Sequence, residues 1–548
     1  MGSTTVTPRL RLRSLPVRDA LRLGRPSDRW FKPALSVAAA SVLPNLALYA
    51  AGRLDLAGYT MAGSLCALYG HDMPYARRAA TLARVVLGML AGVAVALVTA
   101  SLTHSAVVLI AVGAVLAAVQ KAVTDAARIG PPGNVIFTFV AAGALFAPQR
   151  LGQVPGHLAL GLAAGAFAWL VAMAPAVLRA DGPERRAAAR ALTAVAAHTA
   201  APGPRTRHTA TTALRAAWHS LRDSGAPTPN RHALHRLLRR AEAALAGHGP
   251  DEEQLRSWAA ATRARGPVPT SGAPDLPGRA EAALPAGPAR HRLLRSLAPG
   301  AAHTPAALRT LLGCALAGYA TLALGVDRPY WAIVTAASIY QVNTVLTWHR
   351  TLQRTVGNLL GVAVFAAAVP LIRTGPLALV LCLLVLNFAA EALVSRNYWL
   401  GSVAVTPMAL LLVEFTGDHP AGRLIGDRVL DTLIGAAVGF AAALAVTNHR
   451  TADRVRHALD AAGHARAHAE QTLADPAAEP ADLDRAARRL AHSLHELHEA
   501  ETTAAGEWRR RALPEQALRA AEEAGHRTLA GTAKRRGLHT PAPESGAM

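Results

Sequence analysis

Two stretches of the sequence decide the fold: RVVLGMLAG at residues 84–92 and RTVGNLLG at residues 354–361. In each, an arginine precedes a Gly-x-x-x-Gly motif inside a long apolar run. Glycines at this spacing let apolar helices approach closely within a bilayer. The sequence therefore predicts two related membrane helices, each with a close-packing face, at Gly88 and Gly92 and at Gly357 and Gly361.

A second pair of apolar runs repeats the pattern about 270 residues apart. The first contains Gly161 and Gly165, and the second contains Gly435 and Gly439. We expect these glycines to form packing faces as well. Membrane proteins built from two related halves are typical of transporters, so transport is the first function to consider.

The composition combines features that soluble globular proteins rarely share. The chain is 52% apolar, yet its formal net charge is +22. Apolar segments separated by basic loops explain both values. No basic surface module interleaved with aromatic residues is present, so a nucleic-acid partner is not expected. Cys66, Cys314 and Cys382 all lie in apolar runs, where they are interpreted as small core residues rather than disulfides or metal ligands.

Twelve apolar runs approach the length of about 20 residues that a spanning helix needs. This pattern predicts an all-α integral membrane protein of two parallel six-helix repeats, with ten or eleven spans as the alternative count. The candidate spans are 33–52, 54–70, 81–102, 105–121, 133–148, 157–177, 306–325, 329–346, 355–372, 376–394, 398–415 and 429–447.

One long polar segment follows the sixth helix of each predicted half. Both are rich in Ala, Arg, Glu, Leu and His, and Leu234–Leu245 and Leu483–Leu497 have the apolar spacing of amphipathic helices. A Pro/Gly-rich linker at 266–288 and a disordered tail beyond Gly537 are also expected. The resulting domains are a basic segment at 1–32, membrane halves at 33–177 and 305–447, and helical blocks at 178–304 and 448–548.

The distribution of basic residues predicts the orientation. Arginine is frequent before the first run and in alternate loops, for example at Arg77, Arg78 and Arg350. Because cytoplasmic loops carry an excess of Lys and Arg, we expect both termini and both polar segments in the cytoplasm of a bacterium. The first apolar run also fits a signal peptide, but the eleven runs after it favour a retained anchor in the cytoplasmic membrane.

Polar residues within the apolar runs are the first candidates for a substrate path, because they are costly in a bilayer. Thr335, Ser338 and Gln341 recur at three-residue spacing on one predicted helix, with Tyr340 and Asn343 nearby. This stripe could line a polar path. Interhelical hydrogen bonding is the competing interpretation.

Asn387 and Glu391 lie one turn apart in another apolar run. Glu391 is a candidate proton-coupling carboxylate, or alternatively a structural partner of Arg396. Lys121 and Asp125, four residues apart, are interpreted as a local ion pair. Arg428 and Asp431, three residues apart, can be explained in the same way.

Arg84 and Arg354 each precede a Gly-x-x-x-Gly helix, and we expect both at the inner mouth of the bundle. Guanidinium groups bind carboxylates in a forked geometry and keep their charge. These arginines could therefore concentrate an organic anion at a pore. Alternatively, they serve only as topology signals.

Other chemistry is sparse. The sequence contains no Gly-x-x-x-x-Gly-Lys-Ser/Thr phosphate loop and no Gly-x-Ser-x-Gly nucleophile motif. His492, His495 and His498 recur at three-residue spacing, but a solvated helix face explains them better than a metal site. We expect no enzymatic activity, cofactor or bound metal.

An ordered set of motifs occurs in the second half: Arg328-Pro329-Tyr330-Trp331, Arg350, Arg354 with Gly357 and Gly361, Arg396-Asn397-Tyr398, Thr406-Pro407, and Arg428 with Asp431-Thr432 and Gly435. With these motifs, residues 300–447 resemble the fusaric-acid-resistance family, whose members are also called integral membrane bound transporters. The resemblance implies export of aromatic carboxylic acids such as fusaric and hydroxybenzoic acid. A more distant similarity to plant malate channels, which are dimers of six-helix subunits, implies such a dimer fused into one chain. In the first half, the Pro-Tyr-Trp motif is absent and His157 stands in place of Asp431.

Efflux of an aromatic acid or another organic anion is therefore the expected function. A passive anion channel of the same fold and a membrane scaffold whose helices recruit partners are the alternatives. The expected partners are the lipid bilayer, a small organic anion, and either a second copy of the chain or an accessory protein.

Overall fold

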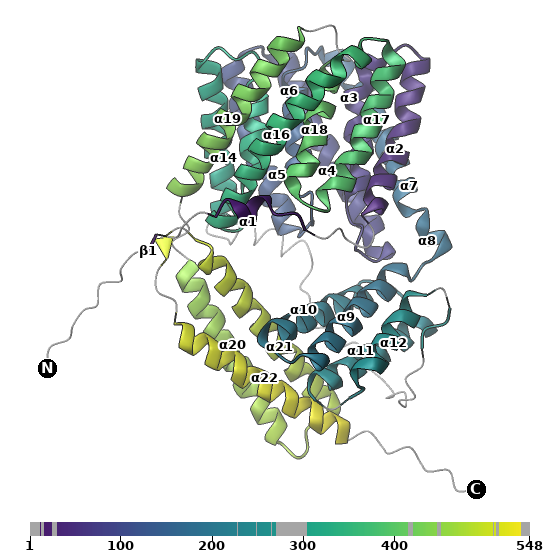
Figure 1. Cartoon of the computed structure of the whole chain (residues 1–548), viewed down its shortest axis with the longest axis vertical. Helices are drawn as coiled ribbons and strands as arrows, with labels where there is room; N and C mark the ends of the chain where they lie inside the picture. The colour runs from purple at the N-terminus through teal and green to yellow at the C-terminus, as the bar shows by residue number, and fades with distance from the viewer. Residues whose placement is uncertain are drawn as a thin grey trace, which may run out of the picture.

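The chain folds into an all-helical membrane protein, apart from two paired strands of two residues each, β1 (Arg11–Leu12) and β2 (Arg509–Arg510). Apolar helices form a bundle at one end, and the polar helices lie together at the other end (Figure 1). The structure is a computed structural model that describes residues 11–12, 16–24, 30–226, 228–247, 249–264, 266–269, 304–414, 420–446, 451–507, 509–510 and 514–538.

The first membrane half contains a helix in each of its six predicted segments. Short 3-10 turns flank the second helix, and a four-residue helix, α8 (Pro175–Leu178), leads out of the bundle. The six helices are α2 (Phe31–Ala50), α3 (Ala57–Ser64), α4 (Tyr75–Leu102), α5 (Ala106–Ala126), α6 (Val135–Leu145) and α7 (Val154–Met173).

The second membrane half follows the same order of long and short helices. Its second helix has 10 residues and its fifth has 17, where the first half has 8 and 11. The six helices are α14 (Thr304–Ala323), α15 (Tyr330–Ile339), α16 (Thr344–Ile372), α17 (Pro376–Val394), α18 (Tyr398–Glu414) and α19 (Ala421–Ala445).

Within the described ranges, eight helices are long and apolar enough to cross a membrane. They leave large apolar side chains on the outside of the bundle: Leu87 is 63% exposed and Val385 is 66% exposed. Contiguous apolar surface of this kind needs an apolar environment. The count differs from the twelve full spans predicted, because α3, α6, α15 and α18 are short helices packed among the long ones.

The predicted span at 329–346 is interrupted. Helix α15 ends at Ile339, and the backbone of Tyr340 is extended. The Asn343 side chain then accepts a hydrogen bond from the Leu346 amide at 2.9 Å and caps a new helix, α16. A capped N-terminus starts a helix with a direction of its own, so Gln341 lies in the break and not on a helical face.

The two halves pack their helices in the same pairs. In each half the second helix contacts the sixth, the third contacts the fifth and sixth, and the first contacts the second and sixth. The contacts between halves are also reciprocal: α2 packs on α17, and α14 packs on α5. The first helix of each half therefore lies against the fourth helix of the other.

The glycines of the repeated motifs lie where neighbouring helices approach most closely. A Cβ atom at Gly361 would lie 2.7 Å from the Thr406 Cβ of α18, and one at Gly435 would lie 2.8 Å from the Ala332 carbonyl oxygen of α15. Gly88, Gly92, Gly161, Gly165, Gly357 and Gly439 also have atoms of adjacent helices within 3.3 Å of an added Cβ. Only glycine permits several of these approaches without movement of a neighbour.

The polar helices form two blocks, each with its own hydrophobic core. The predicted helices at 234–245 and 483–497 are confirmed as parts of α11 and α21. Most of the predicted linker at 266–288 and the tail beyond residue 538 lie outside the described residues. The N-terminal polar block is α9 (Gly182–Ala200), α10 (Pro204–Arg222), α11 (Pro229–Leu245) and α12 (Glu252–Arg263), and the C-terminal polar block is α20 (Thr451–Ala474), α21 (Pro480–Ala505) and α22 (Glu515–Leu538).

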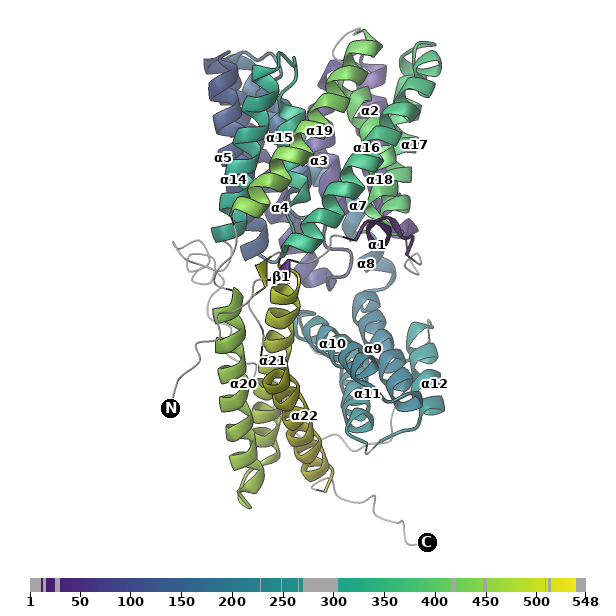
Figure 2. The same ribbon diagram turned by 60° about the vertical axis from the view of Figure 1, so that its left-hand side comes forward.

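Both polar blocks lie on the same side of the membrane bundle, as a second view also shows (Figure 2). An ion pair between Arg77 and Asp223 ties the N-terminal polar block to the start of α4. The C-terminal polar block docks at the break between α15 and α16, where the Val345 amide donates to the Gly506 carbonyl at 3.0 Å. Thr344 donates to the buried Glu507 carboxylate at 2.7 Å. The blocks are therefore joined directly to the helices of the bundle.

Acid is expected to loosen the N-terminal polar block through His235, whose ring packs edge-on against Trp218 at 4.7 Å. Burial, assisted by the nearby charge of Arg239, lowers the pKa of His235 to about 4. In the unfolded chain the histidine has its ordinary pKa of about 6.5, so it takes up a proton before the folded form does. The free energy of unfolding is therefore unaffected above about pH 6.5 and falls by about 1.4 kcal/mol per pH unit as the pH decreases toward 4.

Hydrogen exchange of residues 229–245 at pH 7 and pH 5, corrected for the intrinsic rate, measures this effect. His235→Gln should reduce the loss of protection at pH 5. His232→Gln, at an exposed position on the same helix, should leave it unchanged. Equal losses in the parent protein and in His235→Gln would assign the acid sensitivity to other groups.

Candidate functional site

The predicted polar stripe on α15 is only partly present. Thr335 and Ser338 are both buried, at 0% and 2% exposure, and the Ser338 hydroxyl donates to the Thr335 carbonyl at 2.8 Å. The Thr335 hydroxyl has no hydrogen-bond partner among the described residues. Gln341 departs from the prediction, because the helix ends two residues before it. Its side chain instead donates to the Tyr340 carbonyl at 3.1 Å.

Tyr340 and Asn343 have structural partners. The Tyr340 hydroxyl donates to the Gly439 carbonyl at 3.0 Å and thereby joins the end of α15 to α19. Asn343 caps α16 and packs against Gly506 of the C-terminal polar block. Both residues fix the helix break in place, and neither side chain is more than 6% exposed.

Asn387 and Glu391 lie on α17, away from the stripe. The Asn387 amide donates to the Ser41 hydroxyl of α2 at 3.2 Å, so it connects the two membrane halves. No ion pair between Glu391 and Arg396 is found in the described part of the chain. The interpretation of Glu391 as the partner of Arg396 is therefore not supported. The pair predicted between Lys121 and Asp125 is confirmed at 3.0 Å.

Arg84 and Arg354 occupy different environments although both precede a glycine motif. Arg84 is exposed, and its Nε donates to the Ala80 carbonyl at 3.0 Å. Arg354 is only 3% exposed and lies ten residues into α16, about 15 Å along the helix. The spacing explains the difference, because Arg84 is four residues before Gly88 while Arg354 is three before Gly357. One residue rotates a side chain by about 100° around a helix.

Arg354 belongs to a cluster of charges inside the bundle, which we call the buried charge cluster. It consists of Arg354, Arg428 and Asp431, which are buried, and Arg350, which is half-buried. An Nη atom of Arg354 donates to the Tyr398 hydroxyl at 3.2 Å. The Arg350 guanidinium stacks on the ring of the same tyrosine, with 3.8 Å between the guanidinium carbon and the ring centroid. Tyr398, at the start of α18, therefore holds two arginines of α16 in one place.

Arg428 and Asp431 complete the buried charge cluster from α19. The Arg428 guanidinium carbon lies 4.2 Å from the centroid of the Trp331 ring. All three of its nitrogens lack a hydrogen-bond partner within the described ranges, as do both carboxylate oxygens of Asp431. Their exposures are 1% and 0%. The suggested local pairing of Arg428 with Asp431 is not observed, because the guanidinium lies over Trp331 instead.

A neutral polar network borders the cluster. The Asn358 amide donates to the Thr432 hydroxyl at 3.1 Å and accepts from the Thr406 hydroxyl at 2.6 Å. These three residues join α16, α18 and α19, and each is fully buried. Because their hydrogen bonds satisfy one another, the network fixes the three helices around the unsatisfied charges.

The first membrane half has no equivalent charges. By the spacing to Gly161 and Gly435, His157 corresponds to Asp431 and Val154 corresponds to Arg428. The His157 ring is stacked on Tyr59 with centroids 4.0 Å apart. Val85 has the spacing of Arg354 relative to the glycine motif and is fully buried. Valines therefore stand in the first half where Arg354 and Arg428 stand in the second, although Arg78 near the start of α4 is also buried, at 1% exposure.

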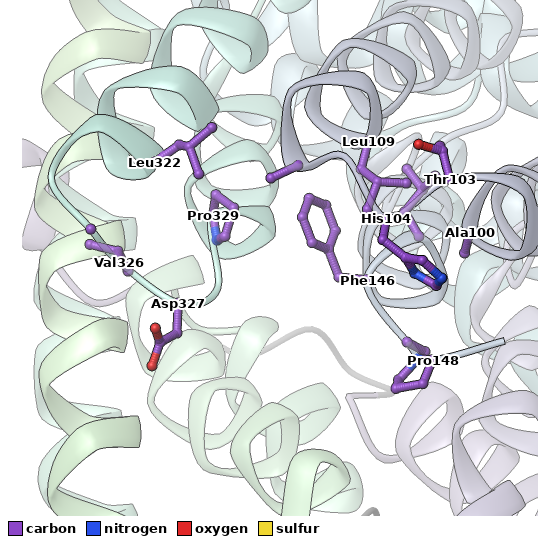
Figure 3. A pocket seen from close by; sticks show the side chains of 14 residues that line it. Ala100, Thr103, His104, Leu109, Phe146, Pro148, Leu322, Val326, Asp327 and Pro329 are labelled. Carbon is purple, nitrogen blue, oxygen red and sulfur yellow. The ribbon is translucent and has the colours of Figure 1, made fainter.

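A pocket of about 470 Å³ opens between the two halves (Figure 3). It lies at the C-terminal end of α4, whereas the N-terminal end of α4 contacts the N-terminal polar block. We call it the distal pocket. It is lined by loops of both halves, including Thr103, His104 and Asp327. Phe146 and Pro329 also line it, and both point toward its interior in Figure 3.

Aromatic side chains connect the distal pocket to the buried charge cluster. The Phe146 ring lies 5.6 Å from the Tyr330 ring, and Tyr330 lies 4.8 Å from Trp331. Trp331 is the residue under the Arg428 guanidinium. A continuous series of contacts thus leads from the pocket between the halves to the unsatisfied arginine.

Arg428, Asp431 and Tyr398 were not among the path residues predicted from the sequence. The available signal was the helical spacing of Arg428, Asp431, Gly435 and Gly439, which places the charged residues on the same face as the packing glycines. Charges on a close-packing face cannot reach water, and this distinguishes them from charges at a helix end.

Comparison with known proteins agrees with this architecture. Residues 314–442 match the family described as fusaric acid resistance protein-like. The chain is therefore a multi-pass membrane protein whose second membrane half, over residues 314–442, is similar to the fusaric acid resistance protein-like family. The family resemblance inferred from the motifs is confirmed.

Two bacterial relatives are similar over part of the chain. The uncharacterized membrane protein YvaC of Bacillus subtilis (strain 168) is 33% identical over 121 residues, which cover 22% of this chain and 19% of the relative. The inner membrane protein YccS of Escherichia coli (strain K12) is 31% identical over 154 residues, covering 28% and 21% respectively. The match thus spans about a fifth of each relative's length. No solved structure matches the chain.

Proposed function

We propose that the chain transports organic anions, with aromatic carboxylates as the preferred class, across the cytoplasmic membrane. The observation that carries this proposal is the Arg428 guanidinium, buried over Trp331 with no hydrogen-bond partner in the described structure. A buried charge without a partner is costly, so its presence favours a ligand of opposite charge.

An aromatic carboxylate matches the groups that surround Arg428. A carboxylate entering the bundle must exchange its hydration for other donors. Arg428 and Arg354 supply guanidinium N–H groups suited to forked binding of a carboxylate, while Trp331 and Tyr398 offer aromatic faces. The aromatic contacts from Phe146 to Trp331 favour a route along the interface between the halves, with the distal pocket as the outer opening.

Asp431 is the group we assign to ion coupling. Its carboxylate is buried beside Arg428 and lacks a hydrogen-bond partner in the described ranges, and intramembrane carboxylates commonly mark proton relays. A substrate anion at Arg428 would lie close to the Asp431 carboxylate, and the two negative charges would repel each other. Protonation of Asp431 would therefore favour substrate binding. A passive channel needs no such group.

The packing supports a fold of two parallel repeats, because both halves pair their helices in the same way and contact each other reciprocally. Their short helices also occur at corresponding positions, α3 with α15 and α6 with α18. Short segments at matching places in two repeats point to a binding site, and α15 carries Trp331. In this arrangement both polar blocks and both termini face the cytoplasm.

Purified protein in proteoliposomes tests the proposal directly. Uptake or release of radiolabelled 4-hydroxybenzoate, measured with and without a pH gradient, should be faster than in empty liposomes. Acceleration by the gradient supports coupled export, whereas equal rates with and without it favour the channel. If the protein adds nothing to the rate of empty liposomes for any aromatic acid in a panel, the transport proposal is wrong and the scaffold becomes the better interpretation.

Labelling of single cysteines is expected to place the polar blocks inside the cell. Gly203→Cys lies at the start of α10, and Thr103→Cys lies in the loop between α4 and α5 at the distal pocket. An impermeant maleimide added to intact cells should label residue 103 and should reach residue 203 only after permeabilisation. Both substitutions are made in a Cys382→Ser background, which is also the control, since Cys382 is half-buried whereas Cys66 and Cys314 are buried. Labelling of residue 203 in intact cells would reverse the topology.

A further inference from the structure

The two polar blocks meet at a group of histidines and carboxylates that the transport proposal does not use. His498 and Glu501 lie one turn apart on α21, and Glu522 lies opposite them on α22. One potential ligand atom from each of these three residues lies within 4.8 Å of the other two. All three side chains are half-buried, so they are sheltered but not sealed from solvent.

A fourth potential ligand comes from the other block. The ring of His208, on α10, lies against the ring of His498, with centroids 3.9 Å apart. The His498 Nδ1 atom is 3.3 Å from a carboxylate oxygen of Glu522, which is a loose contact for a hydrogen bond between charged groups. The group with closely spaced ligand atoms is therefore one imidazole and two carboxylates from α21 and α22, and the His208 ring packs against it from α10 as a fourth potential ligand.

We propose that His498, Glu501, Glu522 and His208 form a binding site for a divalent transition-metal ion such as Zn²⁺, located between the two polar blocks. Zn²⁺ binds imidazole nitrogen at about 2.0–2.1 Å and carboxylate oxygen at about 2.0–2.2 Å in a tetrahedral arrangement. Ligand atoms around such an ion are about 3.3 Å apart. Rotamer changes of His498, Glu501 and Glu522 would close their present spacing of up to 4.8 Å, and the His208 ring would have to turn toward them. The site would join α10 of one block to α21 and α22 of the other.

The charge of the group supports a cation rather than an ordinary ion pair. Glu501 and Glu522 bring two carboxylates beside His498, whose contact with Glu522 satisfies only one of them. His526 near Glu522 and Arg519 near Glu501 are other basic groups in the surroundings.

The neighbouring pair of His495 and Glu499 on α21 differs from this group. Its two side chains are 2.9 Å apart, and among the described residues no third potential ligand lies with them. The four-residue spacing on one helix is enough to explain this pair.

Metal retention by the purified full-length chain tests the proposal. Protein prepared without a histidine tag is stripped with EDTA, exposed to Zn²⁺, passed through a desalting column and analysed for bound zinc. The parent should retain about one equivalent more than His498→Gln or Glu522→Gln, while His495→Gln, the matched control on the same helix, should retain as much as the parent. His208→Gln should weaken binding at least ten-fold without abolishing it.

Binding of Co²⁺ provides a second measurement, because tetrahedral coordination gives intense visible absorption that His498→Gln should lose. Helical content and elution volume must match the parent, and Glu501→Gln replaces Glu522→Gln if the latter misfolds. Failure to retain zinc in the parent, or equal retention in parent, His498→Gln and Glu522→Gln, would overturn the proposal. Neither result would affect the transport proposal, since the groups involved are separate.

Discussion

Replacing Arg428 with glutamine is expected to slow transport of aromatic carboxylates by about 100-fold or more. The guanidinium lies fully buried over Trp331, and its nitrogens are available to a ligand. Losing one partner of a buried charge pair costs about 3–5 kcal/mol, and about 1.4 kcal/mol is a factor of ten. Initial rates in proteoliposomes at several substrate concentrations measure the change.

Three further variants sharpen the result. Arg354→Gln should also weaken transport, and Arg354→Lys should cause a smaller loss, because the charge remains but the forked geometry is removed. Arg84→Gln is the matched control, since Arg84 also precedes a glycine motif but is exposed. A parental rate in both Arg428→Gln and Arg354→Gln would show that the buried charge cluster does not bind substrate.

Gly361→Leu is expected to prevent assembly of the second membrane half. An added Cβ at this position would lie 2.7 Å from the Thr406 Cβ and 2.9 Å from the Val403 carbonyl oxygen, so α16 and α18 would have to separate. Their separation would also break the hydrogen bond from the Thr406 hydroxyl of α18 to Asn358 of α16. Gly361→Ala, which adds only the Cβ, should destabilise the bundle by about 1–3 kcal/mol.

The yield of monodisperse protein and its thermal midpoint in detergent measure both substitutions. Gly143→Ala, on α6, is the matched control, because an added Cβ there has no atom within 4 Å. It should leave the midpoint unchanged or slightly raised, since alanine favours helix. If Gly361→Ala behaves like Gly143→Ala, the close approach of α16 and α18 is not a source of stability.

The fold was largely predictable, because each apolar run indicates the position of one helix and each glycine motif indicates its packing face. Every predicted segment contains a helix, and the family motifs identified the second half correctly. The helix lengths were not predictable. Hydropathy does not reveal that Asn343 caps a new helix, since a cap depends on backbone geometry and not on apolarity. For the same reason, Gln341 could not be assigned to the helix break.

The candidate site was harder to predict, because it depends on which helix faces meet. Arg354 was identified correctly as a candidate, but its burial follows from its rotation toward Tyr398. Arg84 has nearly the same sequence context and faces outward. Arg428 and Asp431 resemble an ordinary i,i+3 pair in the sequence, and only the position of Trp331 on α15 shows that the guanidinium stacks on a ring instead.

The unequal halves have a consequence for binding stoichiometry. His157, Val154 and Val85 occupy the places in the first half that correspond to Asp431, Arg428 and Arg354 in the second. A dimer of identical subunits would present two sites related by symmetry, and their ligands could interact. Under the proposed function, this chain has one buried charge cluster per polypeptide, and we expect a purified aromatic carboxylate to bind with a Hill coefficient of one. The first half then contributes the surface on which the second half packs.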